Sequence, residues 1–154
     1  MSVEENKAVV RRYYEEMGNQ RNLAVADELF APDFRLFPDS PPPHGPEGVK
    51  AFITWLCITA FPDLRVTVEE MVAEGDTVAA RAVLHATQTA PIDWFPEVGV
   101  IPPTGQAFDY TEVHFWRCRG GRIVGRSVMF DNLGLLRQLG AFARPHRVEG
   151  ATTP

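Results

Sequence analysis

The sequence predicts one α+β domain with a curved antiparallel sheet, and two observations carry this prediction. Hydrophobic residues recur at helical spacing up to about residue 60, and from residue 64 they alternate with a period of two. Helices followed by a run of long strands favour α+β over a doubly wound parallel sheet. The 154 residues suffice for one core. We therefore expect a single domain over residues 1–142 and a flexible tail over residues 143–154.

Three helices are expected before the sheet. Ser2 and Glu5 have the spacing of a capping box, which satisfies free N–H groups at the start of a helix. A second, short helix fits residues 23–30 and a third fits residues 47–60. Between them, residues 33–37 alternate like a short strand, and the proline-rich stretch that follows is predicted to be a loop.

The sheet is expected to consist of two hairpins. Glycine-containing turns at residues 74–76 and 119–122 each separate two alternating segments, and a loop rich in proline and aromatic residues joins the hairpins. The predicted strands cover residues 64–73, 77–89, 107–118 and 123–130, and a short terminal helix is expected over residues 133–139.

Composition excludes several classes of function. The net charge of −5 disfavours nucleic-acid binding, which needs clustered Lys and Arg. The start of the chain lacks an apolar signal region, and no segment has the length of a membrane span, so a cytoplasmic protein is expected. Cys57 and Cys118 lie far apart in apolar stretches, which indicates buried thiols. No cluster has metal-ligand spacing, and we expect no metal and no cofactor.

Local phrases spread over residues 6–140 resemble the SnoaL-like polyketide cyclase family of the NTF2-like superfamily. They include Leu29–Phe34, Gly45–Phe52 and Asp131–Gly140. The resemblance implies a cone in which the N-terminal helices pack on one face of the curved sheet and enclose a pocket. It also implies an isomerase or lyase type of enzyme in secondary-metabolite, for example antibiotic, biosynthesis.

The resemblance does not transfer the family's catalytic residues directly. In the family's cyclases an acid on the last strand is supported by a polar residue, often His, on the strand before it. Those positions fall here on Val128 and His114. The Arg and Asp of the superfamily's limonene-type epoxide hydrolases fall on Ala82 and Leu84. The chain therefore uses different residues or does not catalyse a reaction.

The alternation of the third strand selects the candidate catalytic residues. Tyr110, Glu112 and His114 share one face, which we expect to point into the concavity, with Arg126 on the neighbouring strand beside them. Glu112 can orient the imidazole of His114 while the imidazole moves a proton. Arg126 can hold an oxyanion or neutralise Glu112, and an ordinary cross-strand pairing of these groups is the alternative. The opposite orientation would instead place inward Asp109, Thr111 and Arg117.

Aromatic residues indicate a planar or polycyclic guest. The candidate substrate-binding residues are Tyr110, Arg126, Trp55, Trp116, Phe130 and Tyr14, with Tyr13 as the alternative to Tyr14. Trp94 and Phe95 lie in the long loop and are expected to form a lid. Other polar residues have simpler interpretations. Asp131 is expected to cap the last helix rather than act as a base, and a surface position is expected for His44, His85 and His146.

The leading hypothesis is a cofactor-independent cyclase that acts by acid–base catalysis on a hydrophobic, polyketide-like intermediate. An enzyme that opens epoxides and a small-molecule-binding protein without catalysis are the alternatives. Helices on one face of the sheet leave the other face exposed, so a homodimer through the sheet is expected, with Val83 and Phe115 in the interface.

Overall fold

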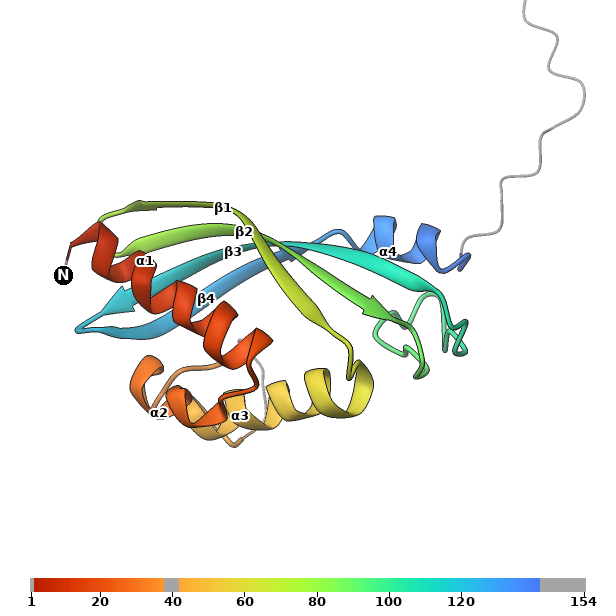
Figure 1. Ribbon diagram of the computed structural model, residues 1–154, viewed down its shortest axis with the longest axis horizontal. Coiled ribbons are helices and arrows are strands. Elements are labelled where there is room, and N and C mark those ends of the chain that lie inside the picture. The colour runs from red at the N-terminus through yellow and green to blue at the C-terminus, as the bar shows by residue number, and fades with distance from the viewer. Residues whose placement is uncertain (1, 38–41, 142–154) are drawn as a thin grey trace, which may run out of the picture.

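The sheet of the computed structural model is an antiparallel meander that curls around one face (Figure 1). The structure describes residues 2–37 and 42–141. The strands follow one another in space as in the chain, with the order β1-β2-β3-β4. Their bounds are β1 (Arg65–Glu74), β2 (Thr77–Thr87), β3 (Ala107–Arg119) and β4 (Arg122–Phe130). The two predicted hairpins are confirmed.

The N-terminal helices lie within one or two residues of their predicted positions but are less regular than predicted. The capping box of Ser2 and Glu5 is present, but both long helices end in wider π-helical turns. The helical elements are α1 (Val3–Arg12), η1 (Tyr13–Asn19), η2 (Leu23–Val25), α2 (Ala26–Leu29), α3 (Gly45–Thr54), η3 (Trp55–Ala60) and α4 (Asn132–Gln138).

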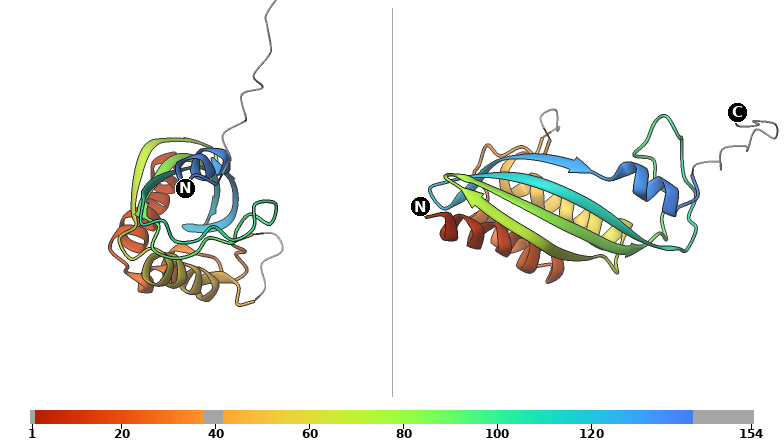
Figure 2. Two further views of the ribbon diagram at one scale, coloured as in Figure 1. Left: turned by 90° about the vertical axis from the view of Figure 1, so that its right-hand side faces the viewer. Right: turned by 90° about the horizontal axis from the view of Figure 1, so that it is seen from above.

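Helices α1 and α3 cover the concave face of the sheet and leave its convex face open (Figure 2). The core lies between these layers and includes Val10, Val49 and Ile53 from the helices and Val78 and Ala82 from β2. These side chains repeat at helical spacing on one side and at every second residue on the other, which is why both layers bury an apolar face. The predicted α+β cone with helices on one face is confirmed.

Side-chain amides attach the first helix to the sheet. The Nδ2 of the buried Asn6 donates to the carbonyl of Gly75 in the β1–β2 turn (3.0 Å). Asn19, at the end of η1, both donates to and accepts from the backbone of Val66 (2.9 and 2.8 Å). These hydrogen bonds fix both ends of α1–η1 against β1 and so set the width of the space between helix and sheet.

The predicted strand over residues 33–37 is wrong. The N–H of Phe34 donates to Ala31 in a turn, and its carbonyl accepts from Gly45 (2.7 Å). These backbone groups are therefore not available for a ladder. The chain instead touches the sheet earlier, where Phe30 forms an isolated parallel bridge with Ile123.

Hydrogen bonds between its own residues hold the long loop between β2 and β3 together. Gln88 is completely buried, and its amide donates to the carbonyl of Pro102 (3.0 Å) while its oxygen accepts from the N–H and hydroxyl of Thr104 (3.0 and 2.6 Å). Ile92 and Ile101 form a further bridge across the loop. The loop is thus held in one arrangement beside the sheet. Within residues 2–37 and 42–141, no helix is long and apolar enough to cross a membrane.

Candidate functional site

The register of β3 places its alternating polar residues inside the cone. Tyr110, Glu112 and His114 lie opposite Leu84, Ala82 and Ala80 of β2, all of which are buried. His114 is 1% exposed. Residues of the opposite face point outward, because Asp109 and Arg117 are exposed and Thr111 is only partly covered. The structure therefore has the first of the two expected orientations.

A cavity of about 390 Å³ opens between the sheet, helix α3–η3 and the long loop. Its wall is mostly aromatic and aliphatic, and its polar members come from β3 and the start of α4. The lining residues are Phe37, Phe52, Trp55, Leu56, Leu84, Trp94, Phe95, Tyr110, Glu112, Phe130 and Asn132. This size and lining suit a small, largely apolar molecule.

A second, much smaller cavity of about 40 Å³ lies deeper, against η1 and β4. Six residues line both cavities, which makes the small one the inner end of the large one: Phe37, Phe52, Leu56, Leu84, Glu112 and Phe130. The inner end adds Tyr13, Tyr14 and Arg126 to its wall. Glu112 is the one carboxylate among the residues that line the two cavities.

The buried His114 forms a hydrogen bond with the half-buried Glu112. The Nε2 of His114 lies 2.8 Å from Oε2 of Glu112. The imidazole is stacked on the indole of Trp116 at 4.9 Å and faces the edge of Tyr14. The imidazole lines neither cavity, whereas Glu112 lines both, so the carboxylate separates the imidazole from the cavity. Of the two predicted catalytic residues, Glu112 therefore lines the cavity itself, and His114 reaches it only through Glu112.

Arg126 lies across from this pair without an acidic partner. One of its terminal nitrogens donates to the carbonyl of Leu36 (2.8 Å), and its guanidinium lies over the rings of Phe37 and Trp116 at 4.8 and 5.7 Å. Its Nε is shielded from solvent and has no hydrogen-bond partner. No carboxylate of the described part of the chain lies within ion-pairing distance of it. Burial lowers the pKa of Arg126 from its ordinary value.

Tyr110 and Asn132 supply hydrogen-bonding groups at the outer end. The Tyr110 hydroxyl donates to the side-chain oxygen of Asn132, and its ring stacks on Phe130 at 5.5 Å. Burial raises the pKa of Tyr110, so its hydroxyl stays protonated at neutral pH. Sequence reasoning missed Asn132. The signal was its place directly after the helix cap Asp131, which accepts from the N–H of Gly134 (2.8 Å) as expected.

The predicted substrate-binding residues divide into three groups. Trp55, Tyr110 and Phe130 line the large cavity, as do Trp94 and Phe95 of the long loop. Tyr14 and Arg126 reach only the inner end. Trp116 lines neither cavity, because it is completely buried behind His114 and donates from Nε1 to the Tyr14 hydroxyl (3.1 Å).

Three residues occupy positions that the resemblance matched to catalytic groups of known enzymes: Val128, Ala82 and Leu84. Val128, which the resemblance matched to the family's catalytic acid, lies directly opposite His114 in the β3–β4 ladder and is apolar. Ala82 and Leu84 face inward and are buried, and neither offers the polar groups of the epoxide hydrolases.

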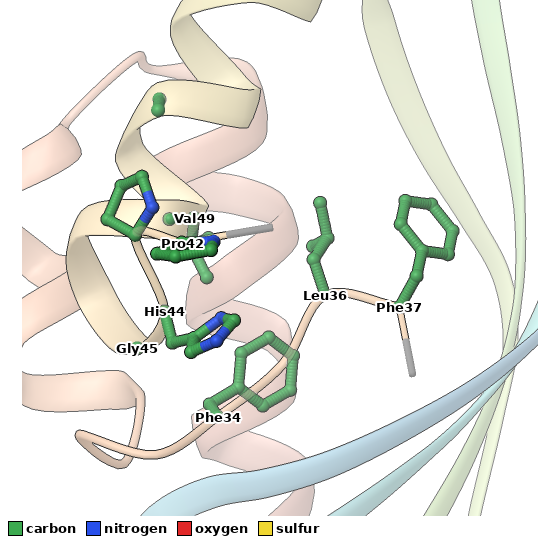
Figure 3. Close-up of a pocket in the computed structure, with 10 residues that line it drawn as sticks. Phe34, Leu36, Phe37, Pro42, His44, Gly45 and Val49 are labelled. Carbon is green, nitrogen blue, oxygen red and sulfur yellow. The ribbon is translucent and has the colours of Figure 1, made fainter. Parts of the chain in front are cut away.

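The remaining candidates lie elsewhere. His85 is on the convex face, where Asp109 (2.6 Å) and Thr67 (3.2 Å) hold its ring. The prediction of a solvent-facing His44 is wrong in part, since the residue is half-buried and its Nδ1 is shielded without a partner. It lines a separate hollow of about 290 Å³ between the start of α3 and residues 34–37 (Figure 3). His146 lies outside the described residues.

The described residues contain no group of three His, Cys, Asp or Glu side chains that could hold a metal ion. Cys57 and Cys118 are free and buried as expected. Burial raises the pKa of both thiols, that of Cys118 to about 11.

Comparison with known proteins gives one consistent family. Among proteins with curated descriptions none matches this sequence significantly. Among solved structures, IdmH, a candidate polyketide cyclase of Streptomyces antibioticus, is 31% identical with a TM-score of 0.69, over 88% of this chain and 98% of its own. A candidate SnoaL-like polyketide cyclase of Jannaschia sp. CCS1 is 27% identical (TM-score 0.72, 91% and 94% covered). TsrD of Streptomyces laurentii is 25% identical (TM-score 0.76, 92% and 99% covered). The model of the SnoaL-like polyketide cyclases matches residues 8–139, and the chain therefore belongs to that family.

Proposed function

We propose that the protein is a cofactor-independent cyclase that closes a ring in a hydrophobic, polyketide-like substrate of secondary metabolism. One observation carries the proposal: an apolar cavity of about 390 Å³ has a single carboxylate in its wall, Glu112, which is hydrogen-bonded to a buried imidazole and shares the inner end of the cavity with the guanidinium of Arg126. Family membership supports the same reaction class.

In this mechanism Glu112 is the base. It takes a proton from an enolisable carbon or a hydroxyl of the substrate, and the resulting anion attacks an electrophilic carbon of the same molecule. The bond that forms leaves negative charge on an oxygen, which is stabilised by a hydrogen bond from Arg126, or from Tyr110 once its hydroxyl turns away from Asn132, before the proton returns from Glu112. The aromatic wall folds the substrate so that one ring closure is favoured. No metal or cofactor takes part.

His114 acts through Glu112 as a positioning residue. Its hydrogen bond of 2.8 Å fixes the orientation of the Glu112 carboxylate. Its stacking on Trp116 keeps the ring in place. Replacing His114 by Gln is therefore expected to slow the reaction without abolishing it.

The proposed base can be tested without knowing the natural substrate. Deuterium exchange at C1 of 2-tetralone, a two-ring ketone, measures proton abstraction directly by NMR in D₂O. The wild-type protein should accelerate exchange, and Glu112→Gln should reduce that acceleration by about 100-fold or more. Glu70→Gln, an exposed change on β1, is the matched control and should have no effect. Equal exchange by wild type and Glu112→Gln would refute the assignment.

Val128 favours a second candidate, a binding protein that has kept the fold without the chemistry. It occupies the position of the family's acid and faces His114 with an apolar side chain. Such a protein would bind two-ring ligands but would not accelerate exchange in 2-tetralone.

We further propose a homodimer through the convex face of the sheet. Phe115, Val72 and Met129 are 47%, 56% and 73% exposed there, whereas Val83, expected in the same interface, is only 7% exposed. Light scattering after size exclusion should give twice the chain mass for wild type and a monomer for Phe115→Glu. A monomeric wild-type protein would exclude the dimer.

A further inference from the structure

We infer that the inner end of the cavity is a subsite for a single hydroxyl group, an enol or a phenol, which donates to Glu112 and accepts from Arg126. The inference rests on the same cavity as the proposed function and specifies how the substrate enters it. The ring system would occupy the outer cavity against Trp55 and Trp94, which contact each other in its wall, with its hydroxyl directed inward.

The first argument is that the guanidinium of Arg126 lacks a hydrogen-bond acceptor at Nε. The Nε of Arg126 is buried, carries a hydrogen and has no acceptor. Only one hydrogen bond of this guanidinium is formed within the described residues, to the carbonyl of Leu36. A buried charged donor without a partner is costly, so an oxygen that fills the inner end and accepts from Arg126 would bind favourably.

The second argument is charge. Glu112 lines the same small space and uses Oε2 for His114. A carboxylate ligand would be attracted by Arg126 and repelled by Glu112, whereas a hydroxyl satisfies both because it can donate to one and accept from the other. Because the ligand must both accept from Arg126 and donate to Glu112, we expect a neutral O–H to bind better than an anion or an ether.

The third argument is size. The inner end has a volume of about 40 Å³, which holds about one to three waters or one oxygen-bearing group, but no second ring. Tyr13, Tyr14 and Phe130 close it on the remaining sides. A methyl group on the oxygen would have to compete with these rings for space.

Equilibrium dialysis against four probes tests the subsite: 2-naphthol, 2-methoxynaphthalene, naphthalene and 2-naphthoate. We expect 2-naphthol to bind the wild-type protein about tenfold more tightly than each of the other three. Equal affinity for 2-naphthol and its methyl ether would overturn the inference. Tighter binding of 2-naphthoate would also overturn it, because that result indicates an anion site.

Two arginine variants on one strand provide the matched comparison. Arg126→Met should weaken 2-naphthol about tenfold and leave naphthalene within about threefold. Arg122→Met makes the same change in a residue that also donates to a backbone carbonyl, that of Phe30 (3.1 Å), but lines neither cavity. It should alter neither affinity. If Arg126→Met does not fold, the ligand series on the wild-type protein still decides the question.

The outcomes separate this inference from the proposed function. Selective binding of 2-naphthol without exchange in 2-tetralone would keep the subsite and refute the cyclase. Glu112-dependent exchange without selectivity for the hydroxyl would do the reverse.

Discussion

Replacing Tyr14 with Phe removes one buried hydroxyl, and we expect this change to lower the unfolding free energy by about 1–3 kcal/mol. Trp116 donates to that hydroxyl at 3.1 Å, and the two side chains are 0% and 3% exposed. In the variant the indole N–H keeps neither an acceptor nor access to water. At about 2–4 °C per kcal/mol for a domain of this size, the melting temperature should fall by roughly 2–12 °C.

Urea unfolding followed by far-UV circular dichroism measures the effect, and a double-mutant cycle isolates its cause. In a Trp116→Phe background no donor remains, so Tyr14→Phe should cost at least about 1 kcal/mol less than in wild type. Tyr13→Phe is the control, because the side chain of this neighbouring tyrosine is also buried but neither donates to nor accepts from Trp116, and the change should cost under about 1 kcal/mol. Additive effects, or a Tyr14→Phe variant as stable as wild type, would refute the reasoning.

Three further predictions concern buried groups and the last helix. Burial raises the pKa of all three tyrosines above the ordinary value of about 10. The unfolded chain therefore loses these protons first, and stability should decline as pH rises above about 10. Tyrosinate absorbance at about 295 nm should appear together with loss of circular dichroism, and its appearance in a folded protein at pH 10 would contradict this. Cys57 and Cys118 should not react with a thiol-specific disulfide reagent at pH 8 until urea is added, because burial keeps both thiols protonated and covered. Gly134→Ala ordinarily stabilises a helix by up to about 1 kcal/mol. Here the new Cβ would collide with the carboxylate of Asp131, so the gain should be seen by thermal unfolding only in an Asp131→Ala background.

The predicted parts of the fold are those that depend on local sequence. Alternation over eight or more residues identified every strand of the sheet, because only one phase of such a pattern buries its apolar side chains. Residues 33–37 alternate for too few positions to distinguish a strand from a turn, and the hydrogen bond from Gly45 to Phe34 comes from a distant part of the chain. The π-helical turns of η1 and η3 also have no local signature.

The sequence predicted which face of the sheet carries the site residues, but not which of their side chains reaches the cavity. Period-two geometry placed Glu112 and His114 on one face and Arg126 beside them, as the β3–β4 register has it. Which group reaches the cavity depends on Tyr14 and Trp116, which cover the imidazole from a helix and from the same strand. That packing joins residues 102 positions apart and cannot be read from spacing.

Single-residue deletions in the two π-helical turns would change the shape of this cavity. Each turn contains about one residue more than an α-helix needs for the same advance. Removing that residue would restore α-helical winding within the turn and change which side chains the turn presents, while the residues beyond it would keep nearly the same face. Both turns lie where the helices border the cavity, at Tyr13–Asn19 and Trp55–Ala60. We expect relatives with other substrates to differ by single-residue gaps at these two places, so that deletion remodels the wall while the sheet that carries Glu112 is unchanged.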